Sequence, residues 1–140
     1  DPDEAIQEVD IMGGVMREIR NYEYTTAQEE DCILLGDLNV PPSRMQKLSS
    51  VAKMVPLIQN MSTNVRENAI YDNILIEPNM TAEFTGQAGV FNMREYFNIS
   101  MDEALRLSDH NPVWAEFWVE ERSNVAYNTQ QVASPYMPQG

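Results

Sequence analysis

The stretch CILLGDLN at residues 32–39 has the pattern of a buried β-strand followed by a polar loop. Its first four residues are apolar, and a short uninterrupted apolar run is expected for a strand that is covered on both faces. Gly36 and Asp37 end the run, and glycine and aspartate are common turn-forming residues. The pattern therefore predicts a strand over residues 32–35 that delivers Asp37 to the edge of a sheet.

Helical and extended patterns surround this strand. Between residues 3 and 20, apolar residues spaced by three or four positions predict an amphipathic helix. Its core-facing stripe consists of Ala5, Val9, Met12, Met16 and Ile19. The other expected segments are a short helix at 43–50 and strands at 70–76, 81–85 and 113–119. Ser100 and Glu103 have the spacing of a capping box that opens one more helix.

Charge and composition limit the classes of function. The chain has 140 residues, a formal net charge of -13 and only nine Lys and Arg residues. Nonspecific nucleic-acid binding depends on basic side chains that displace counterions, so a broad phosphate-binding surface is not expected. A phosphate would instead be held as a small substrate, or through a metal ion bound by carboxylates. No stretch approaches the roughly 20 apolar residues of a membrane span, so no membrane partner is expected. The sequence indicates no particular compartment.

Three short acidic motifs lie at the ends of predicted strands. They are GDLN at 36–39, YDN at 71–73 and SDHNP at 108–112. Asp37 follows the end of one strand, whereas Asp72 and Asp109 precede the bodies of two others, so antiparallel pairing would bring the three carboxylates to one edge of the sheet. With the single histidine, His110, and a nearby Asn amide, they would suit a hard divalent cation such as Mg²⁺ or Mn²⁺.

The three motifs, taken in order, resemble those of a known family. ILLGDLN at 33–39, YDNIL at 71–75 and SDHNPV at 108–113 are similar to successive motifs of the deoxyribonuclease I-like endonuclease/exonuclease/phosphatase family. Each motif alone is weak, but their order and spacing together are specific. The resemblance covers about residues 1–120 and leaves a polar tail at 121–140. It implies an α/β (α+β) fold that is half of a four-layer, two-sheet sandwich, with a mostly antiparallel sheet and helices on one face.

The resemblance implies a role for each matched residue. Asp37 would activate or position the attacking water, and Asn39 would hold that nucleophile or a phosphate oxygen; both are also candidate metal ligands. Asp109 would bind the divalent metal, and His110 would contact the phosphate or stabilise the charge that develops there. Asp72 would orient a catalytic histidine by a hydrogen bond that fixes its tautomer.

Two further residues are candidates for substrate contact, and each of the three aspartates also has a purely structural interpretation. Asn64 and Arg66, just upstream of Asp72, are weaker candidates for substrate contact, and a plain surface charge is the main alternative for Arg66. Taken singly, Asp37 would be a turn residue, Asp72 the start of a strand and Asp109 a turn cap. The joint occurrence of the three motifs favours the functional interpretation.

The implied activity is divalent-metal-dependent hydrolysis of a phosphoester by a nuclease or a phosphatase. In the family, the first half of the domain supplies a metal-binding glutamate, an asparagine and a second histidine, which have no counterpart here. The chain is therefore expected to be the C-terminal half of the domain, inactive without the missing N-terminal half. The sheet face that the missing half would cover is then exposed, so the isolated fragment is expected either to self-associate or to be only marginally stable. A monomer of high thermal stability would count against this half-domain interpretation. The alternative is a non-catalytic binding or assembly module derived from this fold, and the substrate class is left open.

Overall fold

The computed structural model describes residues 2–29 and 31–120, so the tail expected at 121–140 lies outside the described residues. The elements in order are α1 (Pro2–Ala27), β1 (Ile33–Asp37), the 3-10 turn η1 (Pro42–Arg44), α2 (Gln46–Ala52), β2 (Val55–Pro56), β3 (Asp72–Ile76), β4 (Phe84–Val90), α3 (Met93–Phe97), α4 (Met101–Leu107) and β5 (Val113–Phe117). The strands form two antiparallel sheets, β1-β3-β2 and β4-β5. The predicted α+β fold with antiparallel strands is confirmed.

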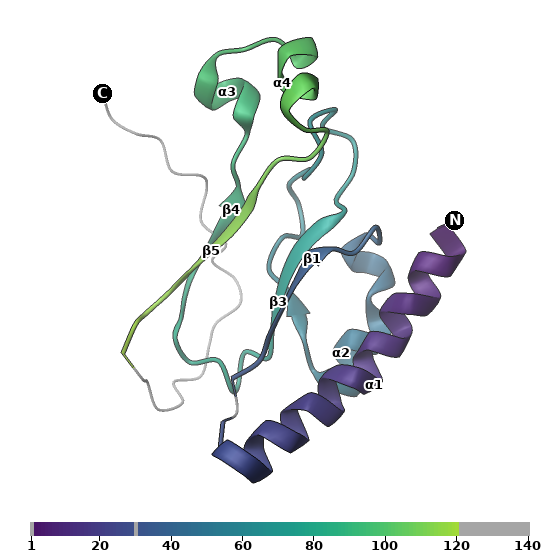
Figure 1. The fold of residues 1–140 in the computed structure, drawn as a ribbon, viewed down its shortest axis with the longest axis vertical. Coiled ribbons are helices and arrows are strands. Elements are labelled where there is room, and N and C mark those ends of the chain that lie inside the picture. Colours follow the sequence, from purple (N-terminus) through teal and green to yellow (C-terminus); the bar gives the residue numbers. More distant parts are fainter. Residues whose placement is uncertain (1, 30, 121–140) are drawn as a thin grey trace.

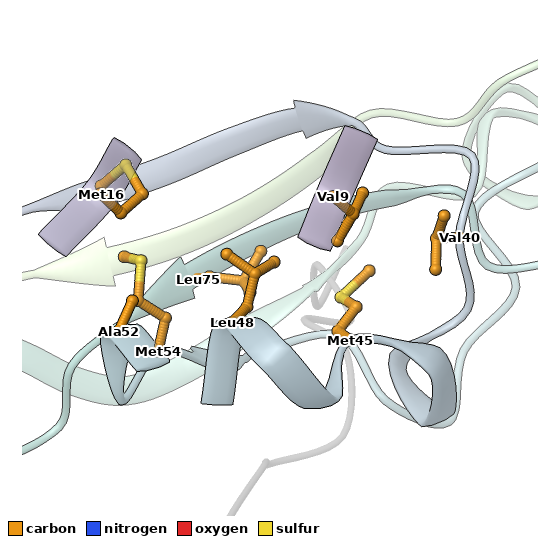
Figure 2. Packing of buried hydrophobic residues seen from close by; sticks show 8 residues of the cluster. All are labelled: Val9, Met16, Val40, Met45, Leu48, Ala52, Met54 and Leu75. Carbon is orange, nitrogen blue, oxygen red and sulfur yellow. The ribbon is translucent and has the colours of Figure 1, made fainter. Parts of the chain in front are cut away.

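Helices α1 and α2 lie together on one side of β1 and β3 (Figure 1). Figure 2 shows Val9 and Met16 of α1 meeting Leu48 of α2 and Leu75 of β3 in one buried cluster. A Cβ atom on Gly13 would lie 3.1 Å from the carbonyl oxygen of Lys47, so a glycine here allows α1 to approach α2 closely. These helices bury the inward face of the three-stranded sheet.

Helix α1 is longer than predicted. It continues to Ala27 instead of ending near residue 20, because residues 15–27 contain neither glycine nor proline. Val9 and Met16 are buried as expected, but Ile19 is exposed, since the turn of the helix carries it away from the core. None of the described helices is both long and apolar enough to span a bilayer.

The second layer is the ribbon of β4 and β5, which packs on the opposite side of β3 (Figure 1). Ile74 and Ile76 alternate with Leu75 along β3 and therefore face this ribbon. Their cluster includes Phe84 of β4 and Phe117 of β5, whose ring centroids are 5.6 Å apart. The central strand β3 is consequently buried on both faces.

Strand β1 is covered on one face only, so the prediction that both faces are buried is wrong. Leu34 packs on the helical cluster, whereas Ile33 is 42% exposed and Leu35 is 67% exposed. The reason is position: β1 lies at the edge of its sheet and its second face has no covering layer among the described residues. An apolar run shows that a strand is hydrophobic, but it does not show which faces of the strand are covered by other elements.

Several boundaries shift for local reasons. The strand expected at 81–85 begins at Phe84, because the amide groups of Met80 and Thr81 donate to the Glu77 carbonyl in a turn. The capping box of Ser100 and Glu103 is confirmed at the start of α4. Helix α3 and the two-residue strand β2 were not predicted, since both are too short to show a hydrophobic period.

Asp31, just before β1, lies beside Glu83, just before β4. Burial raises the pKa of the Asp31 carboxyl to about 6, and the charges of Glu83 and Glu29 act in the same direction. The folded chain therefore holds this proton more tightly than the unfolded chain does. The stability that the protonated group contributes is complete below about pH 4 and is lost as the pH rises through about 6.

We expect Asp31→Asn to change the melting temperature little at pH 4.5 and to raise it at pH 7.5. Asparagine mimics the protonated carboxyl and keeps a donor for Glu83 without introducing the buried charge. Thermal unfolding at the two pH values measures the effect, with Glu116→Gln on the exposed side of β5 as a control. An equal shift at both pH values would contradict the assigned titration.

Candidate active site

Two of the predicted acidic residues face each other across the sheet. Asp37 ends β1, Asp72 begins β3, and the antiparallel register places them directly opposite each other. The order of the strands predicted this juxtaposition together with a third carboxylate, Asp109, which is not in the group that Asp37 and Asp72 form with His110. Like charges directly opposite each other on neighbouring strands repel, so a nearby positive group would stabilise this pair.

His110 supplies a group that can be positive. It follows α4 in the connection to β5, where Asn64 pairs with it in an isolated antiparallel bridge. The Val65 amide donates to the Asp109 carbonyl at 2.8 Å, which fixes the same segment. The Nδ1 atom of His110 lies 2.7 Å from Oδ2 of Asp72. This hydrogen bond places a proton on Nδ1 and leaves Nε2 for other partners.

The electrostatics favour the charged imidazole. Burial lowers the pKa of His110, but the hydrogen bond and charge of Asp72, followed by the charges of Asp37 and Asp109, raise it by more, so the net change is upward. The ring centroid of Tyr71 lies 5.9 Å from that of His110. The site therefore combines an oriented histidine with surrounding carboxylates.

The residues present fit a divalent cation. One donor atom from each of Asp37, Asp72 and His110 lies within 4.8 Å of the other two. Carboxylate oxygens are the ligands that Mg²⁺ and Mn²⁺ prefer, whereas imidazole is a more usual ligand of metals such as Fe and Zn. Because Nδ1 of His110 already pairs with Asp72, the carboxylates of Asp37 and Asp72 are the donors that this site offers to a cation. Nε2 of His110 can join them only while the imidazole is neutral. The exposed Asp109 is not in this group, and its role as a ligand stays a prediction.

Asn39 sits beside Asp37 through a tight turn. The main-chain nitrogen of Asn39 donates to Oδ1 of Asp37 at 3.1 Å. The φ angle of Asn39, 52°, is in the left-handed region, which asparagine tolerates better than most residues. The side chain is exposed. The turn explains the spacing of Asp37 and Asn39, and the role predicted for Asn39 stays a prediction.

The two weaker candidates differ in their surroundings. Arg66 is exposed, as either of its interpretations requires. Asn64 is buried, and its side-chain oxygen accepts from the amides of Asn68 and Ala69, both at 3.0 Å. Its amide nitrogen donates to Oδ1 of Asn68 at 2.6 Å. The Asn64 side chain thus organises its own loop, and substrate contact by Asn64 or Arg66 stays a prediction.

Sequence reasoning assigned no role to two residues that adjoin the pair of Asp72 and His110. Thr63 and Asn111 are both buried and hydrogen-bond to the segments that carry the two members of the pair. A lone threonine or asparagine in a polar loop has no signal in one sequence, because its partners come from distant positions. Tyr71 had a weak signal, its place next to Asp72.

The fold and the site define an α+β protein with a carboxylate and histidine cluster at the edge of an antiparallel sheet. No protein-family model matches the chain. It is similar to deoxyribonuclease-1-like 1 of Mus musculus, with 29% identity over 103 residues that cover 66% of this chain and 33% of that protein. The Sus scrofa counterpart is 31% identical over 100 residues, covering 64% and 31%. Deoxyribonuclease gamma of Mus musculus is 28% identical over 144 aligned positions, covering 94% and 44%.

These similarities confirm the resemblance to the deoxyribonuclease I-like family that the three motifs predicted. The chain spans between 31% and 44% of the length of these relatives. It therefore corresponds to a part of each of them.

Proposed function

We propose that this chain carries one part of the active site of a divalent-metal-dependent phosphoester hydrolase, with DNA as the first candidate substrate. The observation that supports it most is the 2.7 Å contact between His110 and Asp72, at the sheet edge where Asp37 faces Asp72. The names of the relatives, which are deoxyribonucleases, favour a nuclease over a phosphatase.

Each residue has a chemical task in this proposal. Asp72 holds His110 in one tautomer, and the raised pKa of His110 favours an imidazolium that neutralises negative charge on the phosphate. Asp37 positions the attacking water and accepts its proton, while the Asn39 amide holds the nucleophile or a phosphate oxygen. A bound divalent ion would supply further charge stabilisation as a Lewis acid.

The proposal includes an incomplete site. The described residues bring one histidine and two carboxylates together, and the relatives are more than twice as long as the matched segment. Glu, Asn and His side chains from another segment would complete the ligand and proton-transfer groups. The exposed residues Ile33 and Leu35 of β1 offer an apolar surface on which that segment would pack. We therefore expect this chain alone to be inactive.

Hydrolysis assays test the proposal directly. This chain and a longer polypeptide of its parent protein would be incubated with plasmid DNA, bis-p-nitrophenyl phosphate and p-nitrophenyl phosphate, with Mg²⁺ or Mn²⁺ and with a chelator. We expect metal-dependent cleavage of DNA and the diester by the longer polypeptide only. If the longer polypeptide neither binds the metal nor hydrolyses any of the three substrates, the enzymatic function is contradicted, and a non-catalytic binding or assembly module is the better interpretation.

A further inference from the structure

Thr63 is a fully buried residue in the loop between β2 and β3. Its hydroxyl oxygen accepts two hydrogen bonds, from the amide nitrogen of Tyr71 at 2.9 Å and from that of Asp72 at 3.1 Å. Its own amide donates to the Ala69 carbonyl at 2.8 Å. The hydroxyl therefore fixes the main chain at the start of β3, where Asp72 enters the site.

The main chain of Thr63 also reaches the segment of His110. The Thr63 carbonyl accepts from the amide of Asn111 at 2.7 Å, and Asn111 directly follows His110. The next residue, Asn64, forms the antiparallel bridge with His110 itself. A single residue thus joins the main chains on both sides of the contact between Asp72 and His110.

We propose that Thr63 is a positioning residue that holds Asp72 and His110 at hydrogen-bonding distance. Its consequence for catalysis rests on the proposed function, but the positioning itself does not. The aspartate side chain is short, so the distance between Oδ2 and Nδ1 follows the position of the β3 main chain. Without the hydroxyl, the main-chain amides of Tyr71 and Asp72, which are partly buried, lose their acceptor and must move toward another one or toward water.

The first test is spectroscopic and needs no substrate or metal. His110 is the only histidine of the chain, so its imidazole signals identify themselves in an NMR spectrum. We expect the hydrogen-bonded Nδ1 proton to be visible in the unmodified chain and in Thr63→Ser, which keeps the hydroxyl. The signal should broaden or disappear in Thr63→Val, which keeps the shape of the side chain and loses the acceptor.

The second test is kinetic and uses the active longer polypeptide. Loss of a group that orients a catalytic residue typically lowers activity by about 10- to 100-fold, and we expect kcat of Thr63→Val to fall by this factor. KM should change by less than about threefold, because Thr63 touches no substrate in the proposal. Thr63→Ser should restore most of the activity.

Thr85→Val is a matched control. The Thr85 hydroxyl accepts from the Gln87 amide at 3.2 Å in β4, so the change removes the same type of hydroxyl-to-amide hydrogen bond at an exposed position elsewhere in the fold. We expect it to leave the His110 signal and kcat unaltered. A folded Thr63→Val chain with an unchanged His110 signal would overturn the positioning role. If Thr63→Val does not fold, Thr63→Cys, with its weaker acceptor, takes its place, and an unchanged His110 signal there would overturn the role equally.

The two tests separate the inference from the proposed function. If the NMR signal depends on the Thr63 hydroxyl but the protein has no hydrolytic activity, the positioning role is supported and the proposed enzymatic function is contradicted. If the enzyme is active but neither the His110 signal nor kcat depends on the Thr63 hydroxyl, the proposed function is supported and the positioning role is overturned.

Discussion

Replacing His110 by alanine in the active longer polypeptide is expected to lower kcat by about 10²- to 10⁴-fold, the usual range for loss of a proton-transferring or charge-stabilising group. The change removes the imidazolium that would neutralise phosphate charge and leaves Asp37 and Asp72 facing each other without it. Initial rates of diester hydrolysis at saturating metal measure the effect. Asp102→Asn, in the exposed first turn of α4, is the control and should keep full activity.

The double variant distinguishes two roles for Asp72. If Asp72 acts only by orienting His110, Asp72→Asn should lower kcat strongly in the unmodified background and add little once His110 is alanine. Residues that act as a unit show such non-additive effects. If the kcat losses of the two single variants multiply in the double variant, Asp72 acts independently of His110, for example as a metal ligand through its second carboxylate oxygen.

The sequence predicted the placement of the two facing carboxylates better than it predicted the residues that hold them in place. Asp37 closes one strand and Asp72 opens another, so antiparallel pairing was enough to place them together. The family motifs implied that Asp72 would orient a catalytic histidine, but they did not identify His110 as that histidine. The two hydrogen bonds of Thr63 could not be predicted, since they join positions eight and nine residues apart through an irregular loop.

Burial was predicted least well where it depends on a second layer. Leu34 and Leu35 have the same hydrophobicity and the same sequence context, yet only Leu34 faces the helices. Asn73 shows the opposite case, a polar residue that is fully buried. Its side chain accepts from the Ile58 amide at 3.0 Å and donates to the Ile58 carbonyl at 2.7 Å. The Asn73 side-chain amide thus pairs with the main chain of Ile58 as a neighbouring strand would. Hydrophobicity alone does not indicate this pairing.

Arg20→Met is expected to reduce the free energy of unfolding by about 3–5 kcal/mol, the usual cost of removing one partner of a buried ion pair. The Arg20 guanidinium pairs with Oε2 of Glu77, which is only 3% exposed, and also donates to the Ala52 carbonyl. Arg20 thereby ties α1 to the end of α2 and to the residue that follows β3. Its removal leaves a buried carboxylate without a counter-charge, and chemical denaturation of this chain would measure the loss.

Two further variants decide whether the unpaired charge is the cause. Glu77→Leu in the Arg20→Met background removes that charge, and apolar replacement of a buried pair is often neutral, so we expect most of the lost stability to return. The control is the ion pair of Lys47 and Asp10, which also joins α2 to α1, at 2.8 Å, but has a lysine side chain that is 60% exposed. Lys47→Met should therefore cost no more than about 1 kcal/mol. Equal losses for Arg20→Met and Lys47→Met, or no recovery in the double variant, would show that packing of the Arg20 side chain determines the stability of this junction.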